Sequence, residues 1–115
     1  MKLIVAIIQP TKLQAVKEAL KEVSIERMTV CDAHGFGRQR GQVETFRGHE
    51  YQIRFLRKIC LEIAVNDDFV ERALKVVQRV ARSGTEGNIG DGKVFVMPLE
   101  TAIRIDDSVS GPEAI

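Results

Sequence analysis

The 115-residue chain has little of what marks several common classes of protein. Aromatic residues make up 5% of it, with no tryptophan and one tyrosine. The two cysteines, Cys31 and Cys60, match no metal-binding spacing, and we expect reduced thiols rather than a disulfide framework. Seventeen Lys and Arg against sixteen Asp and Glu give a net charge of +1. This balance argues against a dedicated binder of nucleic acid or of an anionic membrane.

Long apolar runs are also lacking. The longest, Leu3 to Ile8, has six residues, whereas a membrane span needs about 20 and a secretory signal core at least about 7. We therefore expect a cytoplasmic protein that does not insert into membranes. The hydrophobic fraction of 44% and charged fraction of 29% are typical of globular proteins and exclude disorder. The length predicts a single domain over residues 1–115.

Hydrophobic periodicity predicts the order strand, helix, strand, long loop, strand, helix, strand. Apolar or alternating runs predict strands at 3–8, 28–34, 59–65 and 94–97, with an extended piece at 102–105. This order is typical of an α+β, ferredoxin-like βαββαβ fold, an antiparallel sheet with both helices on one face.

Apolar stripes at three- and four-residue steps predict the two helices. The first runs from Thr11 to about Val23, with Thr11 as its cap and Gln14 placed to complete a capping box. The second follows the cap residues 66–68 and ends at Gly84. The stripes consist of Leu13, Val16, Leu20 and Val23 in the first helix, and Val70, Ala73, Leu74, Val77, Val80 and Ala81 in the second.

The long loop, about residues 37–55, is rich in glycine and in basic residues. A structureless segment of about 20 residues inside a compact domain is usually functional. Tyr51, the only tyrosine, lies midway along this loop, where a modifying enzyme could reach its hydroxyl. A lone amphipathic surface residue is the plainer interpretation of Tyr51.

Two glycine-rich segments are candidate anion sites. Residues 87–93, in a loop spanning about 83–93, match the spacing GxxxxGK. Val94 replaces the Ser or Thr of a true P-loop, and the order is helix, loop, strand. The glycines still allow backbone N–H groups to converge on an anion beside Lys93, although an ordinary glycine-rich turn fits equally well. Residues 35–41 are one residue too long for a dinucleotide fingerprint, but offer Arg38 and Arg40 to phosphate.

Enzyme-like constellations are poor. His34 and His49 have no metal-ligand spacing to each other or to either cysteine. The carboxylates Asp67 and Asp68 stand at a helix start, where capping explains them. We therefore expect no catalytic residues and no enzyme.

Taken together, these segments resemble the nitrogen regulatory protein P-II family. The resemblance extends over essentially the whole chain, with several motifs in the right order and spacing. The segments that carry it are Ala6–Ile8, Pro10, Lys12–Leu13, Gly35–Gly41, Arg47–Gly48, Glu50–Tyr51, Ile89–Val96, Ala102–Ile105 and Glu113–Ile115.

The resemblance implies a homotrimer of ferredoxin-like subunits with nucleotide sites in the clefts between them. Such proteins are sensors rather than enzymes. They bind ATP or ADP competitively and, with Mg-ATP, bind 2-oxoglutarate. The long loop, called the T-loop in the family, docks onto targets such as an ammonium channel, regulators of glutamine synthetase or acetylglutamate kinase.

The resemblance also assigns roles to individual residues. Gln39 would help to coordinate Mg²⁺, Lys58 would pair with a 2-oxoglutarate carboxylate, and Tyr51 is a possible site of uridylylation. Arg104 would reach the phosphates of a neighbouring subunit's nucleotide. The nucleotide-binding set is Thr29, Gly35, Phe36, Gly37, Arg38, Gln39, Gly90, Asp91, Gly92, Lys93 and Arg104; the 2-oxoglutarate set is Gly37, Gln39, Lys58 and Gly90.

The chemistry of these ligands agrees with that set. A triphosphate needs convergent N–H donors and cations. A dicarboxylate beside it adds like charge, so Mg²⁺ would bridge the two anions while Lys58 offsets the outer carboxylate. Affinity for 2-oxoglutarate would then depend on Mg-ATP, and this coupling must be reciprocal.

Some residues depart from the family pattern. The glycine loop is longer than its commonest form by about three residues and carries Glu86. Asp106 replaces an arginine of the usual Ile-Arg-Ile-Arg ending, which predicts weaker phosphate binding. These changes favour, as an alternative, a sensor of another small molecule such as an adenylate or bicarbonate, whereas the retained Gln39 and Lys58 favour 2-oxoglutarate. A nucleic-acid binder would need aromatic residues on the central strands, and the segment 59–63 has none.

Overall fold

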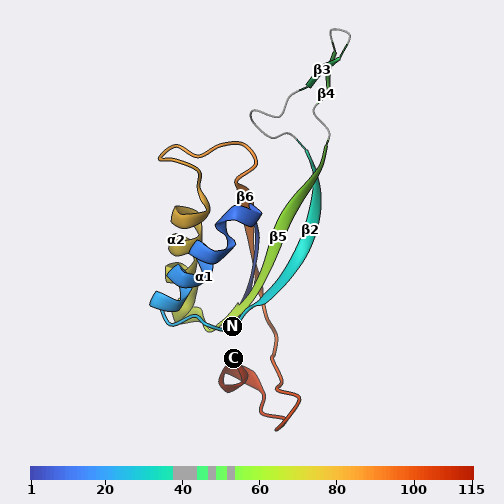
Figure 1. Cartoon of the computed structure of the whole chain (residues 1–115). Coiled ribbons are helices and arrows are strands. Elements are labelled where there is room, and N and C mark those ends of the chain that lie inside the picture. Colours follow the sequence, from blue (N-terminus) through green and yellow to red (C-terminus); the bar gives the residue numbers. More distant parts are fainter. Residues whose placement is uncertain (38–43, 47–48, 52–53) are drawn as a thin grey trace.

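The computed structural model describes residues 1–37, 44–46, 49–51 and 54–115 (Figure 1). Four of its strands form one antiparallel sheet in the order β2-β5-β1-β6. A separate pair, β3 (Glu44–Phe46) and β4 (His49–Tyr51), forms a small ribbon. The sheet consists of β1 (Lys2–Ile8), β2 (Thr29–Gly37), β5 (Arg54–Val65) and β6 (Gly92–Pro98).

Two helices, α1 (Leu13–Glu22) and α2 (Asp67–Ala81), lie side by side on one face of this sheet (Figure 1). A 3₁₀ helix, η1 (Pro10–Lys12), directly precedes α1, and a second, η2 (Gly111–Ala114), lies near the C-terminus. The predicted ferredoxin-like order is therefore confirmed. No helix in the described part of the chain is both long and apolar enough to cross a membrane.

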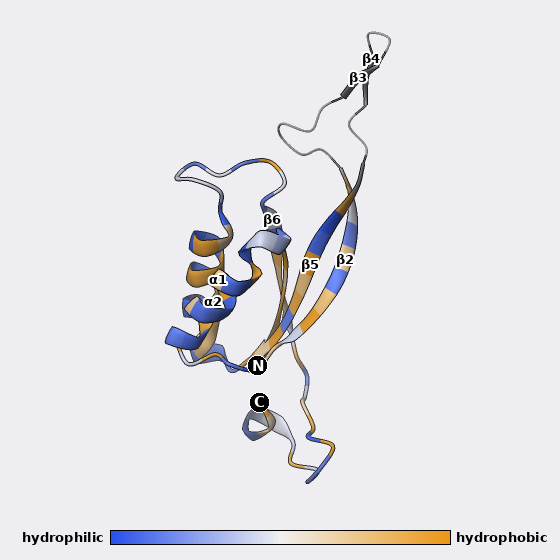
Figure 2. Ribbon diagram, in the orientation of Figure 1, coloured by the Kyte–Doolittle hydropathy of each residue, from blue (hydrophilic) through white to orange (hydrophobic). Residues whose placement is uncertain are grey.

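The core lies between the sheet and the helices, because alternate strand residues face the helical stripes. Figure 2 shows the hydrophobic and hydrophilic sides of both helices. The predicted stripe of the second helix lacked one member, Val76, whose side chain is buried. The completely buried side chains are Ile4, Ala6, Val16, Leu20, Leu61, Ile63 and Ala73.

The predicted cap of the first helix is wrong, whereas Asn66 does occupy the N-cap position of α2. Residues 10–12 form a 3₁₀ turn, in which the Lys12 amide donates to the Gln9 carbonyl at 3.0 Å. Thr11 therefore lies inside a turn and cannot cap α1, and the Gln14 amide instead donates to Glu18 at 3.1 Å. Asn66 makes no side-chain capping bond to α2, and its side-chain amide instead donates to the Pro112 carbonyl at 3.2 Å.

Several element boundaries also differ from the predictions. Strand β2 continues to Gly37, and β5 begins at Arg54, which pairs with Gly37. The β2–β5 pair therefore extends beyond the core (Figure 1). Backbone pairing needs no apolar side chain, which is why hydrophobic alternation missed this extension. Helix α2 ends at Ala81, and Gly84 has a φ of +65° in the loop that follows. In the segment 102–105, Ile103 forms an isolated bridge with Ser110.

Candidate functional site

An open concavity of about 390 Å³ lies where the glycine-rich loop meets the sheet. Strands β1, β2, β5 and β6 and the loop after α2 all contribute to its walls. Its lining residues are Ile7, Gly35, Phe36, Leu56, Lys58, Ile89, Gly90, Gly92, Lys93 and Phe95.

The carbonyl oxygen of Gly90 is held by two side chains. The Lys58 ammonium donates to it at 2.6 Å, and the Gln9 amide donates to it at 2.8 Å. Lys58 is 7% exposed, and its burial lowers the pKa of the ammonium, although the negative charge of Asp91 partly opposes this shift. The Lys58 ammonium is therefore buried beneath the loop. A buried charge needs a polar partner, and here that partner is the Gly90 carbonyl.

The carboxylate of Asp91 closes the loop from the other side. It accepts hydrogen bonds from the backbone N–H of Ser83 at 2.9 Å, the Ser83 hydroxyl at 2.6 Å and the backbone N–H of Asn88 at 2.8 Å. Partial burial would raise the pKa of Asp91, but the bonds from Ser83 and Asn88, with the charge of Lys12, outweigh it and lower the pKa. The ionised carboxylate is thus an internal support of the loop.

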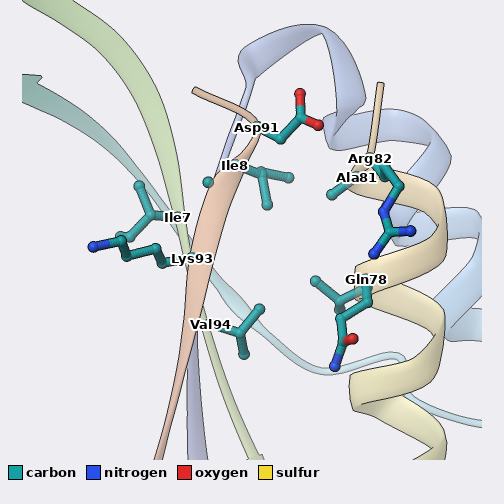
Figure 3. Close-up of a pocket in the computed structure, with 10 residues that line it drawn as sticks. Ile7, Ile8, Gln78, Ala81, Arg82, Asp91, Lys93 and Val94 are labelled. Carbon is teal, nitrogen blue, oxygen red and sulfur yellow. The ribbon is translucent and has the colours of Figure 1, made fainter. Parts of the chain in front are cut away.

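Figure 3 shows Asp91 and Lys93 on opposite sides of β6. Asp91 adjoins a second concavity, of about 380 Å³, between β6 and the C-terminal end of α2. The side chains of Ile8, Ala81 and Val94 face this space, with Arg82 beside them (Figure 3). The two concavities therefore lie on either side of β6, and Lys93 points away from the Asp91 carboxylate.

Three large, solvent-exposed apolar side chains line the first concavity. Phe36 is 70% exposed, Ile89 64% and Phe95 50%. Clustered exposed apolar side chains of this kind mark ligand or protein contact surfaces. Together with the ammonium groups of Lys58 and Lys93, they suit a ligand that has a flat apolar ring and a strongly anionic part.

The loop has a backbone that only glycine readily adopts. Gly87, Gly90 and Gly92 have φ values of +77°, +101° and +126°. At Gly87, a Cβ atom would lie 3.2 Å from both Arg82 Cγ and Asp91 Oδ2. Side chains are thereby excluded where the loop turns, which leaves backbone groups free to approach a ligand closely.

Of the predicted ligand residues that the structure describes, six lie at this concavity. Gly35, Phe36, Lys58, Gly90, Gly92 and Lys93 line it. Gly37 ends β2, Tyr51 ends β4, and Arg38 and Gln39 lie outside the described residues.

Thr29 and Arg104 lie far from this concavity. Thr29 begins β2, six residues before Gly35, a separation of about 20 Å along a strand. Arg104 lies on the C-terminal segment, at the opposite end of the molecule from the glycine loop (Figure 1). There its guanidinium pairs with Asp107, with Nε to Oδ1 at 3.2 Å and Nη2 to Oδ2 at 2.8 Å.

Sequence reasoning missed several residues of the site. Gln9 anchors the glycine loop, and Ser83 holds Asp91. Ile7, Leu56 and Phe95 complete the apolar lining. Only Gln9 gave a signal, as a polar residue directly after the apolar strand and before Pro10.

Comparison with known proteins connects this arrangement to one family. The family described as nitrogen regulatory protein P-II matches residues 1–108. The nitrogen regulatory protein P-II of Bradyrhizobium diazoefficiens is 52% identical over 115 residues, and that of Azospirillum brasilense is 50% identical, each over all of both chains. Nitrogen regulatory protein GlnK1 of Methanosarcina mazei is 44% identical over the whole of this chain and 97% of its own.

Proposed function

The chain belongs to the nitrogen regulatory protein P-II family, a family of signalling regulators rather than enzymes, and we propose that it senses ATP or ADP together with 2-oxoglutarate. The observation that carries this proposal is the buried Lys58 ammonium, 2.6 Å from the Gly90 carbonyl, at a concavity rimmed by exposed apolar side chains. A cation and an apolar surface thus lie next to the glycine loop.

The nucleotide would occupy this concavity. Its base would pack on the apolar side chains of Phe36, Ile89 and Phe95. Its phosphates would contact Lys93 and the backbone of residues 90–92. The positive φ values of Gly90 and Gly92 support this assignment, since such backbone turns can expose N–H groups to an anion. Arg38 and Asp91 complete the set that we assign to the nucleotide, with Asp91 acting through the shape of the loop.

The 2-oxoglutarate would bind beside the phosphates. Its outer carboxylate would be neutralised by Lys58, and Mg²⁺, held by Gln39 and the phosphates, would bridge the two anions. Gly37 and Gly90 would offer backbone contacts. Because each ligand then supplies part of the other's site, each raises the affinity for the other by the same factor.

A homotrimer would complete the site. Thr29 and Arg104 lie too far from Gly90 in their own subunit, so their proposed nucleotide contacts require a neighbouring copy. The helix-free face of the sheet supports such packing, because Phe95 and Met97 on β6 are exposed there. Burying an apolar face against copies of itself is a common route to symmetric assembly.

As a P-II regulator, the protein acts on target proteins, and the T-loop would make that contact. Strands β2 and β5, which border this loop, extend as a pair beyond the core to Gly37 and Arg54 (Figure 1). We propose targets of the kinds already named, an ammonium channel, regulators of glutamine synthetase or acetylglutamate kinase, all reached in the cytoplasm, and Tyr51 as a site of uridylylation.

Isothermal titration of 2-oxoglutarate tests the proposed ligands. The titration is run with Mg-ATP, with Mg-ADP and without nucleotide, and it is repeated with the Lys58→Met variant. We expect heat in wild type only with Mg-ATP, and none in the variant. Binding of nucleotide without any 2-oxoglutarate heat would refute the effector assignment, and heat with bicarbonate or AMP would support the alternative sensor.

A further inference from the structure

We propose that Gln9 is a positioning residue that holds the glycine loop in place while Lys58 engages the 2-oxoglutarate carboxylate; this inference rests on the proposed function. The Gly90 carbonyl receives one bond from a charged donor, Lys58, and one from a neutral donor, Gln9. A bound dicarboxylate would attract the charged ammonium of Lys58 much more strongly than the neutral amide of Gln9.

The peptide group between Gly90 and Asp91 is fixed at both of its polar atoms. Its carbonyl accepts from Lys58 and Gln9, and its N–H, that of Asp91, donates to the Asn88 carbonyl at 3.1 Å. This peptide begins the segment that would bind phosphate. Its orientation therefore decides where the neighbouring backbone donors point.

Lys58 offers one nitrogen to both this peptide and any anion that it engages. Its three N–H donors all lie on Nζ, so a movement of Nζ toward a carboxylate lengthens the 2.6 Å bond to Gly90. A carbonyl that loses its partner in a partly buried place costs free energy. The charged bond is thus the one that ligand binding weakens.

Gln9 stays in place during that exchange. It lies directly after β1, at the N-cap of the 3₁₀ helix η1, and its backbone carbonyl accepts from the Lys12 backbone N–H at 3.0 Å. A neutral amide gains little from an approaching carboxylate compared with an ammonium. The Gly90 carbonyl consequently keeps one donor, and the loop keeps its shape while Lys58 turns to the effector.

The substitution Gln9→Met tests this role, because it retains the length of the side chain and removes the donor. In the variant, Lys58 alone holds Gly90, so recruiting Lys58 leaves the carbonyl unpaired. We expect the Kd of 2-oxoglutarate, measured by titration with saturating Mg-ATP, to rise about five- to tenfold. The Kd of Mg-ATP measured without 2-oxoglutarate stays within about twofold, because Lys58 then still holds the loop.

Gln14→Met is the matched control. It makes the same change on α1, where the Gln14 amide bonds to Glu18 on an exposed face. If Gln9→Met fails to fold, as judged by circular dichroism, Gln9→Leu provides the same loss of donor with another apolar side chain.

Two results would overturn the inference. One is an unchanged 2-oxoglutarate Kd, and the other is an equal weakening of Mg-ATP alone, which would reveal a purely structural role. Failure of the proposed function itself has a different pattern, since wild type and Gln14→Met would then also show no 2-oxoglutarate heat.

Discussion

A Cβ atom on Gly92 would lie 1.8 Å from the carbonyl oxygen of Ile7 on the neighbouring strand. Gly92 pairs with Ile8 in the register of β1 and β6, and its φ is +126°. The glycine loop therefore enters the sheet at a place where backbone approaches backbone directly. The atoms nearest to this Cβ position are all backbone atoms of Ile7 and Ile8, which cannot rotate away as a side chain could. A side chain at Gly92 must therefore displace a strand.

We expect Gly92→Ala to lower the free energy of unfolding by about 3 kcal/mol or more, through the clash and the positive φ together. Gly84→Ala is the control, because Gly84 also has a positive φ, +65°, but nothing lies within 4 Å of its Cβ position. Its cost should be about 1 kcal/mol, from strain alone. Urea unfolding at equal protein concentrations measures both, and similar midpoints would contradict the expectation.

The carboxylate of Asp91 should make stability depend on pH. Its pKa is lowered in the folded protein. Its contribution to the free energy of unfolding is therefore present above the pKa of the unfolded chain, about 3.9, and is lost as pH falls through the folded pKa. Asp91→Asn should cost about 1 kcal/mol at pH 7, because an amide accepts less well from Ser83 and Asn88. The difference between wild type and variant should shrink below about pH 4, and a constant difference in urea unfolding would refute it.

Lys58 provides a prediction for the effector. Lys58→Met should abolish 2-oxoglutarate binding while leaving the chain folded, since a buried methionine needs no partner. Lys75→Met is the control, because Lys75 is exposed on α2 and pairs with Glu71 at 3.4 Å. Titration calorimetry compares the two variants, and retained binding in Lys58→Met would exclude Lys58 as the carboxylate partner.

Lys58 should also affect the pH dependence of stability. Burial lowers the pKa of Lys58, so between the folded and unfolded pKa values the unfolded chain binds more protons. The stability of wild type relative to Lys58→Met should therefore rise with pH through that alkaline window. If the pKa of Lys58 were not lowered, the difference in free energy of unfolding between wild type and variant would stay constant with pH in urea unfolding.

Asp106 provides a prediction for the nucleotide. The side chain is exposed and lies two residues from Arg104, which is already paired with Asp107. Asp106→Arg should raise the affinity for ATP about two- to fivefold, the effect of one solvent-exposed ion pair, and salt should reduce the gain. Glu100→Arg makes the same change of charge elsewhere on an exposed position, and an equal gain there would point to net charge rather than to position.

Hydrophobic patterning predicted most of the fold. The strands at 3–8 and 59–65 and the stripes of both helices required only the alternation of buried and exposed positions, which is a local property of the chain. The resemblance to the P-II family came from motifs in the right order. It named Gly35, Lys58 and Gly90, which the fold brings to one concavity.

Tertiary structure alone decided the contacts between distant residues. The bonds of Gln9 and Lys58 to Gly90 span 81 and 32 residues, and no local pattern encodes them. Nor does spacing show that Asp91 turns inward to Ser83 while Lys93 faces the other side of β6 (Figure 3). The sequence by itself thus determined which segments form strands and helices, because periodicity is local, and which family they belong to, because the order of motifs is written along the chain. Which donors meet at the Gly90 carbonyl depended on how the strands pair, because pairing brings together side chains that the sequence separates.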